Sequence, residues 1–238
     1  MSGLFRASFN SFSISAKLVR WLSFSLAMVV CLPWVYAGAI DLSPRLLSYV
    51  ASRWGGGAEE RLKGWSNFVT LQQQRRENRA VDPDSRSSPV YATNRLWAGV
   101  PYLSDQSNWG MDDYWATPVE VMGINHADCE DYAIAKYFTL KELGVPVSKM
   151  RITYVRALRW NEPHMVLAYY PEPDSEPYIL DNLTDRIDVA SDRRDLEPIY
   201  SFNDDDLWTA GSAAKAGKSS QIRLWRGLIE KMDKEQRM

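Results

Sequence analysis

Cysteine is scarce in this chain, which has only Cys31 and Cys129 among its 238 residues. Cys31 lies inside an apolar N-terminal segment, so removal of that segment would leave Cys129 without a partner for a disulfide. Exported proteins normally use their cysteines in pairs. A single remaining thiol is therefore either buried and inert or retained for its chemistry.

Acidic residues are missing from the start of the chain, where the first carboxylate is Asp41. Lys17 and Arg20 precede an apolar run from Trp21 to Ala37, which contains a proline and ends in small residues. Its length of 17 residues is at the short end for a membrane span and is typical of an export signal. We therefore expect residues 1–37 to be a cleaved signal peptide, with a retained anchor as the alternative.

An excess of basic residues is also absent, because 28 lysines and arginines stand against 30 aspartates and glutamates. Cleavage would remove Arg6, Lys17 and Arg20, which leaves 25 basic and 30 acidic residues and a net charge of −5. This balance argues against nucleic acid as a partner. The length suits one domain, and the 10 tryptophans and 12 tyrosines suit a core and a peptide-binding groove.

The first part of the mature chain has the periodicity of helices over residues 41–80. Ser43 and Pro44 are a favourable helix start in "LSPRLLSYVASRW", and a second amphipathic helix follows a glycine break. Residues 81–93 are rich in proline, aspartate and serine, and predict a loop.

Two further helices are predicted around Cys129. In "TPVEVMG", Thr117 and Glu120 form a capping box with a proline between them, and Gly123 ends this short helix. The next helix begins at Asp128 and ends before the "GVP" sequence. Cys129 then sits in a first turn, where free N–H groups and the helix dipole stabilise a thiolate.

The second half of the chain has the period of strands. Residues 151–160, 164–170 and 178–183 read as three strands joined by the turns "NEP" and "PEPDSEP". Helices followed by an antiparallel meander predict an α+β fold, with the helix that carries the thiol packed on the sheet.

The C-terminal part predicts a separate small element. Residues 210–220, "AGSAAKAGKSS", suggest a flexible linker. Beyond it a basic amphipathic helix has its apolar positions at Ile222, Trp225, Leu228, Ile229 and Met232. We expect this helix to dock on the domain, with contact to a partner or a membrane surface as the alternative. The expected organisation is a domain over residues 38–210 followed by a linker and helix over 211–238.

A nucleophile, a base and an orienting group can be assembled from these elements. His164 opens the second strand and Asp181 lies near the end of the third, and these strands are neighbours in a meander. Packing of the helix on the sheet can bring Cys129 to the imidazole. His126 is close to the thiol in sequence and remains a second candidate for the base.

Three carboxylates flank the thiol: Asp128, Glu130 and Asp131. Negative neighbours raise the pKa of a thiol and oppose its ionisation. Acids at a helix N-terminus are favourable without any ion, yet three oxygen ligands this close also make the start of a calcium site.

The motifs "WATPVE", "DCEDYAIAKYFTLKELGVP", "PHMVLAY" and "YILDNL" resemble those of the bacterial transglutaminase-like cysteine proteinases, and the resemblance spans residues 54–209. It implies a papain-like fold of the transglutaminase type, with Cys129 as nucleophile, His164 as base and Asp181 as orienting carboxylate. It also implies a calcium requirement that involves Asp128, Glu130 and Asp131.

The sequence departs from the family just before the nucleophile, where relatives have a glycine-rich turn and this chain has "GINHADCED". Asn125 can adopt a left-handed conformation and replace one glycine. Ala127 cannot do so without strain, so we expect the geometry of this turn to differ from that of the family.

The resemblance implies a periplasmic endopeptidase that cuts the N-terminal region of a large surface adhesin, which releases the adhesin and disperses a biofilm. Its expected partner is the periplasmic domain of an inner-membrane cyclic-di-GMP receptor. Two other functions remain open from the residues alone. One is transglutaminase or amidase chemistry on cell-wall peptides, and the other is a non-catalytic peptide-binding module.

Overall fold

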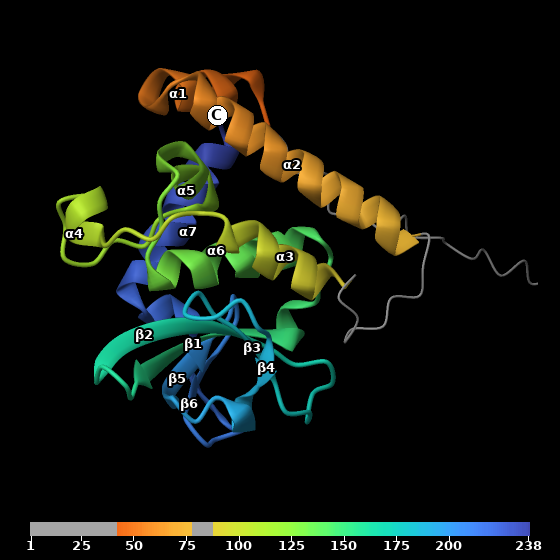
Figure 1. The fold of residues 1–238 in the computed structure, drawn as a ribbon, viewed down its shortest axis with the longest axis vertical. Helices are drawn as coiled ribbons and strands as arrows, with labels where there is room; N and C mark the ends of the chain where they lie inside the picture. The colour runs from red at the N-terminus through yellow and green to blue at the C-terminus, as the bar shows by residue number, and fades with distance from the viewer. Residues whose placement is uncertain (1–41, 78–87) are drawn as a thin grey trace, which may run out of the picture. The chain divides into compact units, whose positions relative to one another are not determined.

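The computed structural model describes residues 42–77 and 88–238, which are drawn in colour in Figure 1. The chain divides into two compact units, residues 1–34 and 35–238, and only the second contains described residues. The predicted signal peptide, residues 1–37, therefore lies outside the described residues. Within the described ranges, no helix is long and apolar enough to cross a membrane.

The two helices predicted at the start of the mature chain are present. α1 spans Pro44–Trp54 and α2 spans Gly56–Glu77. Ser43 caps α1 by accepting a hydrogen bond from the backbone N–H of Leu46 at 3.0 Å. Leu62 of α2 is fully buried, as expected for an inner position of an amphipathic helix.

The loop predicted over residues 81–93 is wrong at its end, where α3 spans Pro89–Ala98. Ser88 caps this helix by accepting a hydrogen bond from the N–H of Tyr91 at 3.4 Å. A proline at the first helical position has a suitable φ and no N–H that needs a partner. The residues that suggest a loop therefore begin a helix, while residues 81–87 lie outside the described part of the chain.

Three helices lead through the middle of the chain to the thiol: α4 Asp105–Asn108, α5 Pro118–Ile124 and α6 Cys129–Glu142. The capping box predicted for α5 is confirmed. Thr117 Oγ1 accepts from the N–H of Glu120 at 3.0 Å, and Glu120 Oε2 accepts from the N–H of Thr117 at 2.9 Å.

The turn between α5 and α6 forms from Asn125, His126 and Ala127, without a glycine in these three positions. Asn125 takes the left-handed conformation with φ of 60°. Ala127 has no positive φ and instead makes an isolated parallel bridge, with its N–H donated to the carbonyl of Pro101 at 3.1 Å. Gly123 is needed for a different reason, since a Cβ there would lie 2.5 Å from the Trp54 ring.

An antiparallel sheet forms the second layer, with its described strands in the order β4-β3-β2-β1-β5-β6-β7. The strands are β1 Met150–Ala157, β2 Glu162–Tyr169, β3 Tyr178–Leu180, β4 Asp188–Val189, β5 Leu196–Phe202, β6 Leu207–Thr209 and β7 Lys215–Gly217. The predicted meander is confirmed as β1, β2 and β3, although the third strand ends at Leu180 rather than at residue 183. β4, β6 and β7 have two or three residues each, too few to show an alternating pattern.

The helices α3 and α6 lie along one face of this sheet, with α6 packed on β1 and β2 (Figure 1). The α+β architecture expected from the sequence is therefore confirmed. A small apolar cluster of Val155, Val166, Ala168 and Ile179 is separate from the main core and belongs to the other face of the sheet.

The C-terminal prediction is correct for the helix and wrong for the linker. Residues 215–217, inside the predicted linker, pair with β6 as strand β7. α7 spans Arg223–Gln236, and its Trp225 and Leu228 are buried in the main core. The predicted docking on the domain is confirmed, so this segment belongs to the same domain.

Candidate active site

Cys129 lies in the first turn of α6, as the sequence predicts, although the helix begins at Cys129 and not at Asp128, which is its N-cap. Its side chain is partly buried, and it is the only free cysteine in the described part of the chain. The N–H groups of a first helical turn have no acceptor within the helix. The turn that precedes α6 therefore places both the thiol and these N–H groups at one end of the helix.

His164 and Asp181 form the pair that the sequence predicts. Nε2 of His164 lies 2.7 Å from Oδ1 of Asp181, and the two residues are 5% and 3% exposed. An ionised carboxylate only accepts hydrogen bonds, so the imidazole donates from Nε2 and its Nδ1 carries the lone pair. This tautomer leaves Nδ1 able to accept a proton.

Asp181 is held as a carboxylate by several donors. Arg193 Nη2 lies 2.5 Å from its Oδ2, and the backbone N–H groups of Asn182 and Leu183 donate to its Oδ1 at 2.7 and 3.1 Å. Burial alone would raise the pKa of Asp181. The hydrogen bond and charge of His164, together with Arg193, outweigh burial and hold this pKa well below its ordinary value.

Two cations that support this pair were not predicted from the sequence. Arg193 is itself fixed by Asp195, whose carboxylate accepts from Nε and Nη2 at 3.0 and 2.8 Å. Lys136 of α6 is fully buried and donates to the carbonyl of Asp181 at 2.8 Å. Burial lowers the pKa of Lys136 to about 8. Arg193 lies in a polar run and Lys136 in a helix, where neither carries a sequence signal of its role.

The thiol and the imidazole line one cleft of about 790 Å³. The backbone of Met165, the residue after His164, acts to lower the pKa of the Cys129 thiol and so opposes part of the effect of burial. Trp115 and Tyr154 also line this cleft. The structure therefore brings the three predicted residues together at the junction of α6 and the sheet.

His126, the other candidate base, is placed differently. Its Nδ1 lies 3.2 Å from the carbonyl oxygen of Ile124, and no hydrogen bond to a carboxylate is found for it in the described residues. It is not among the residues that line the cleft. The geometry favours His164 as the base.

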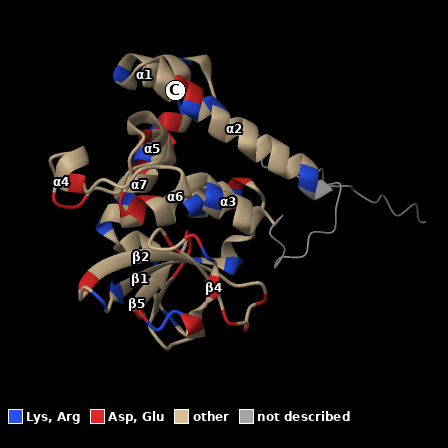
Figure 2. Ribbon diagram, viewed as in Figure 1, with Lys and Arg blue, Asp and Glu red and all other residues tan. Residues whose placement is uncertain are grey.

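Carboxylates gather beside Cys129 in two overlapping groups, Asp105 with Asp113 and Glu130, and Asp105 with Asp128 and Asp131. Within each group, one oxygen per residue lies within 4.8 Å of the others. Figure 2 shows acidic segments on α4 and on the loop that follows it. α4 contributes Asp105 and the loop contributes Asp113, two residues that sequence reasoning missed. Asp105 and Asp113 are distant in sequence from the thiol, and no motif marks them.

This cluster has oxygen atoms that could hold a metal ion. Oδ1 of Asp105 and Oδ1 of Asp128 are buried without a hydrogen-bond partner among the described residues. Burial and the neighbouring carboxylates raise the pKa of Asp105 to about 6 and that of Asp128 to about 10. Unpaired buried carboxylate oxygens are the ligands that Ca²⁺ prefers, and its charge would remove their mutual repulsion.

Asp131 has a structural role within the same cluster. Its Oδ1 accepts from the N–H of Ala116 at 2.8 Å, and its Oδ2 accepts from the N–H of Asp128 at 3.4 Å. Each carboxylate oxygen has a second lone pair, so these bonds leave room for a cation. Asp131 therefore fixes the start of α6 whether or not it is a ligand.

The acids also act on the thiol. Sγ of Cys129 donates to Oε2 of Glu130 at 3.0 Å. Burial raises the pKa of Cys129, and the charges of Glu130 and Asp128 raise it further. A bound cation would oppose the contribution of the acids.

Comparisons with known proteins agree with this geometry. Residues 69–197 match the family model described as bacterial transglutaminase-like cysteine proteinase. LapG from Legionella pneumophila in an EGTA-treated structure is 36% identical, with 79% of this chain and 96% of that chain covered and a TM-score of 0.66. A calcium-bound structure of the same protein is 36% identical, with 80% and 99% covered and a TM-score of 0.64. The search of curated proteins found no match.

Proposed function

This chain belongs to the bacterial transglutaminase-like cysteine proteinases, and we propose that it acts as a calcium-dependent endopeptidase with Cys129 as its nucleophile. The observation that carries the proposal is one cleft in which Cys129 and the Asp181-paired His164 lie beside a buried carboxylate cluster. A structural free cysteine requires neither an oriented imidazole nor such a cluster.

In the proposed reaction His164 takes the thiol proton at Nδ1, because its Nε2 is engaged by Asp181. The sulfur of Cys129 then attacks the peptide carbonyl, and the imidazolium returns the proton to the leaving amine. Asp181 stabilises the imidazolium as it forms. Free N–H groups in the first turn of α6 are suited to hold the oxyanion.

We assign calcium to the carboxylates beside the thiol, with Asp105, Asp128 and Glu130 as the main ligands and Asp113 and Asp131 as further candidates. The unpaired Oδ1 atoms of Asp105 and Asp128 support this assignment, as does the calcium-bound structure of LapG. When bound, the ion would supply positive charge next to a thiol whose pKa the acids otherwise raise.

The location, substrate and partner are proposed from the family resemblance. Residues 1–37 would direct export to the periplasm, where the enzyme would cut the N-terminal region of a large surface adhesin and so promote biofilm dispersal. The periplasmic domain of an inner-membrane cyclic-di-GMP receptor would bind and sequester it.

The proposal is tested by incubating the mature chain with surface proteins taken from cells that express it, and by identifying the products by mass spectrometry. The wild type should yield shorter peptides, and Cys129→Ala and His164→Gln should yield none. His126→Gln is the matched control and should remain active, because this histidine is outside the cleft. Crosslinked or amine-adducted peptides would instead support transglutaminase chemistry.

Calcium dependence is tested on the same reaction. Excess EGTA should abolish cleavage, and added Ca²⁺ should restore it. Full activity in excess chelator would contradict the calcium assignment. A thiol that reacts with iodoacetamide no faster than a buried cysteine, with and without calcium, would favour the non-catalytic binding module.

A further inference from the structure

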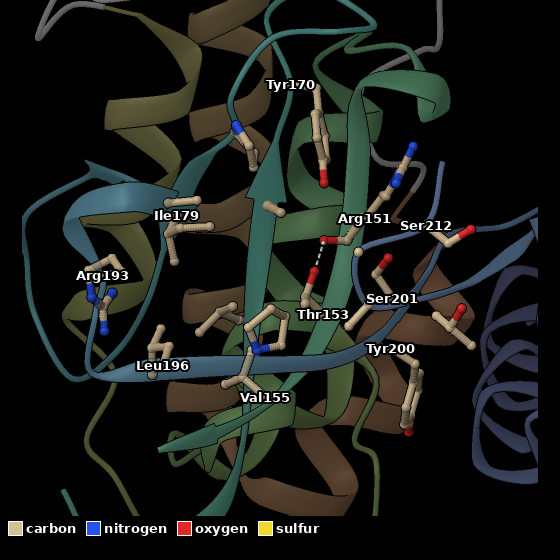
Figure 3. Close-up of a pocket in the computed structure, with 18 residues that line it drawn as sticks. Arg151, Thr153, Val155, Tyr170, Ile179, Arg193, Leu196, Tyr200, Ser201 and Ser212 are labelled. Atoms are coloured by element: carbon tan, nitrogen blue, oxygen red, sulfur yellow. Dashed lines mark hydrogen bonds between the residues drawn. The ribbon is translucent and has the colours of Figure 1, made fainter. Parts of the chain in front are cut away.

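A second cavity lies on the face of the sheet turned away from α6, and the proposed reaction makes no use of it (Figure 3). Its volume is about 330 Å³. The floor is the small apolar cluster Val155, Val166, Ala168 and Ile179, whose members are 1–7% exposed. An apolar floor with a few polar groups on its walls is the usual composition of a binding site.

The charge of this cavity is opposite to that of the catalytic cleft. Arg151 and Arg193 line it, and no aspartate or glutamate is among its lining residues. Arg193 is already paired with Asp181 and Asp195, so the positive charge that can attract a ligand is that of Arg151, for which the described residues provide no ion pair. The cleft on the other face is lined by carboxylates that include Asp105, Asp128 and Glu130. An acidic ligand would therefore be attracted to the outer cavity and repelled from the cleft.

Both arginines have N–H groups that the described residues leave unused. Arg193 is 6% exposed, and its Nη1 is buried without a hydrogen-bond partner. The Nε of Arg151 is buried and unpaired as well. The guanidinium of Arg151 lies over two aromatic rings, 4.0 Å from the centre of Trp208 and 4.7 Å from that of Tyr170, which holds it in place. Unpaired buried N–H groups are costly, and a carboxylate would satisfy them.

The shape of the cavity suits an extended chain. Its lining comes from β3, β2, β1 and β5, four adjacent strands of the sheet. Adjacent strands are about 4.8 Å apart, so the cavity crosses about 14 Å. An extended peptide covers this span with about four residues. A single side chain would leave most of the floor uncovered.

We propose that this outer cavity binds an extended peptide segment of a partner protein, with apolar side chains on the sheet and a carboxylate side chain at Arg151. Arg193 also holds Asp181 through Nη2, so the occupant contacts the residue that orients the proposed catalytic carboxylate. The site is distinct from the cleft and does not depend on the chemistry proposed there.

The test uses the Cys129→Ala mature chain, so that no cleavage can occur, and the blocked peptide acetyl-Gly-Val-Asp-Val-Gly-amide as probe. Binding is followed by backbone amide shifts in two-dimensional NMR, which also report whether each variant is folded. We expect shifts at Thr153, Ala168 and Ser201, which line the cavity. The same peptide with asparagine in place of aspartate should bind about tenfold more weakly or worse, because a charge-assisted hydrogen bond is lost.

Two charge variants make the test specific. Arg151→Gln should weaken binding about tenfold, and Arg186→Gln should not change it, because Arg186 is an exposed arginine outside the cavity. Ala168→Leu, which fills the floor, should abolish the shifts. The proposal is overturned if the aspartate and asparagine peptides bind equally, if shifts occur only around Cys129, or if no shift appears at millimolar peptide.

Discussion

Replacement of Arg193 by glutamine is expected to destabilise the protein because it removes one partner of a buried ion pair. The side chains of Arg193 and Asp181 are 6% and 0% exposed. Breaking such a pair costs about 3–5 kcal/mol. Asp181 keeps His164 and two backbone N–H groups, so we expect about 3 kcal/mol, the lower end of that range. For a domain of this size the melting temperature should fall by about 6–12 °C.

The same substitution should change the pH dependence of stability. The pKa of Asp181 is depressed in the folded chain, so its contribution to stability is present above the unfolded pKa of about 3.9 and is lost as the pH falls through the folded value. Without Arg193 the folded pKa rises towards the ordinary value. The variant should therefore lose stability at a higher pH than the wild type during acid titration.

Activity should fall less than it would on loss of Asp181 itself. Removing an orienting carboxylate costs about 10⁴ in kcat. Arg193→Gln leaves the bond from Asp181 to His164 in place, so we expect a decrease of about 10–100-fold in kcat/KM, which corresponds to about 1.4–2.7 kcal/mol. Arg193→Lys should recover part of this loss, since it restores the charge.

The measurements are thermal unfolding, acid titration of stability, and steady-state cleavage of the surface protein that mass spectrometry identifies as the substrate. Arg156→Gln is the matched control, because Arg156 forms an exposed ion pair with Glu197 in which both side chains are about half exposed. Exposed pairs contribute about 0–1 kcal/mol. If Arg193→Gln has the same melting temperature and acid titration as this control, the assignment of Arg193 to Asp181 is refuted.

Three further predictions concern other parts of the domain. Asp105→Asn should weaken Ca²⁺ binding, measured by calorimetry, by about tenfold or more, whereas Asp112→Asn should have little effect because Asp112 is exposed and outside both carboxylate groups. In the wild type we expect the unfolding free energy to rise by about 2–3 kcal/mol between pH 8 and pH 10, because the pKa of Lys136 is lowered to about 8 in the folded chain. Lys136→Met should abolish this rise. An equal dependence of unfolding free energy on pH in the two proteins would contradict the prediction. Trp225→Ala should cost about 3–5 kcal/mol in denaturant unfolding, because Trp225 is 2% exposed and stacks on Phe138 at 5.7 Å. A cost below about 1 kcal/mol would show that α7 is not part of the core.

Much of the fold could be predicted because local signals agree with the tertiary structure. Thr117 and Glu120 predict a capping box and form one. The meander follows from the alternation over residues 151–183. The short strands β4, β6 and β7 could not be predicted, because they form only where the longer strands present an edge to pair with. The segment at 215–217 reads as a linker for the same reason, since Ala216 and Gly217 have no side chain that indicates a strand, and the segment forms one only by pairing with β6.

The candidate site also contains some residues that the sequence could predict and others that it could not. The order of the elements suggests Cys129, His164 and Asp181, and the family resemblance favours His164 over His126 as the base. In the structure Cys129 and His164 line one cleft, and His164 is paired with Asp181 just after β3. Arg193 and Asp105 could not be found, since Arg193 lies in a connection between strands and Asp105 in a four-residue helix, and no local pattern specifies the path of either segment to the site. The turn before the thiol also depends on tertiary structure, because Ala127 pairs with a distant segment instead of adopting a left-handed conformation.

The position of α7 has a consequence for the order in which the chain can fold. Trp225 packs against Phe138 of α6 and Phe202 of β5. Lys231 also donates to the carboxylate of Glu120 at 2.9 Å, near the start of α5. A growing chain therefore lacks one wall of its core until residues 223–236 have left the ribosome. Such a late closing step delays compaction of the domain until α7 is available to pack on α6 and β5.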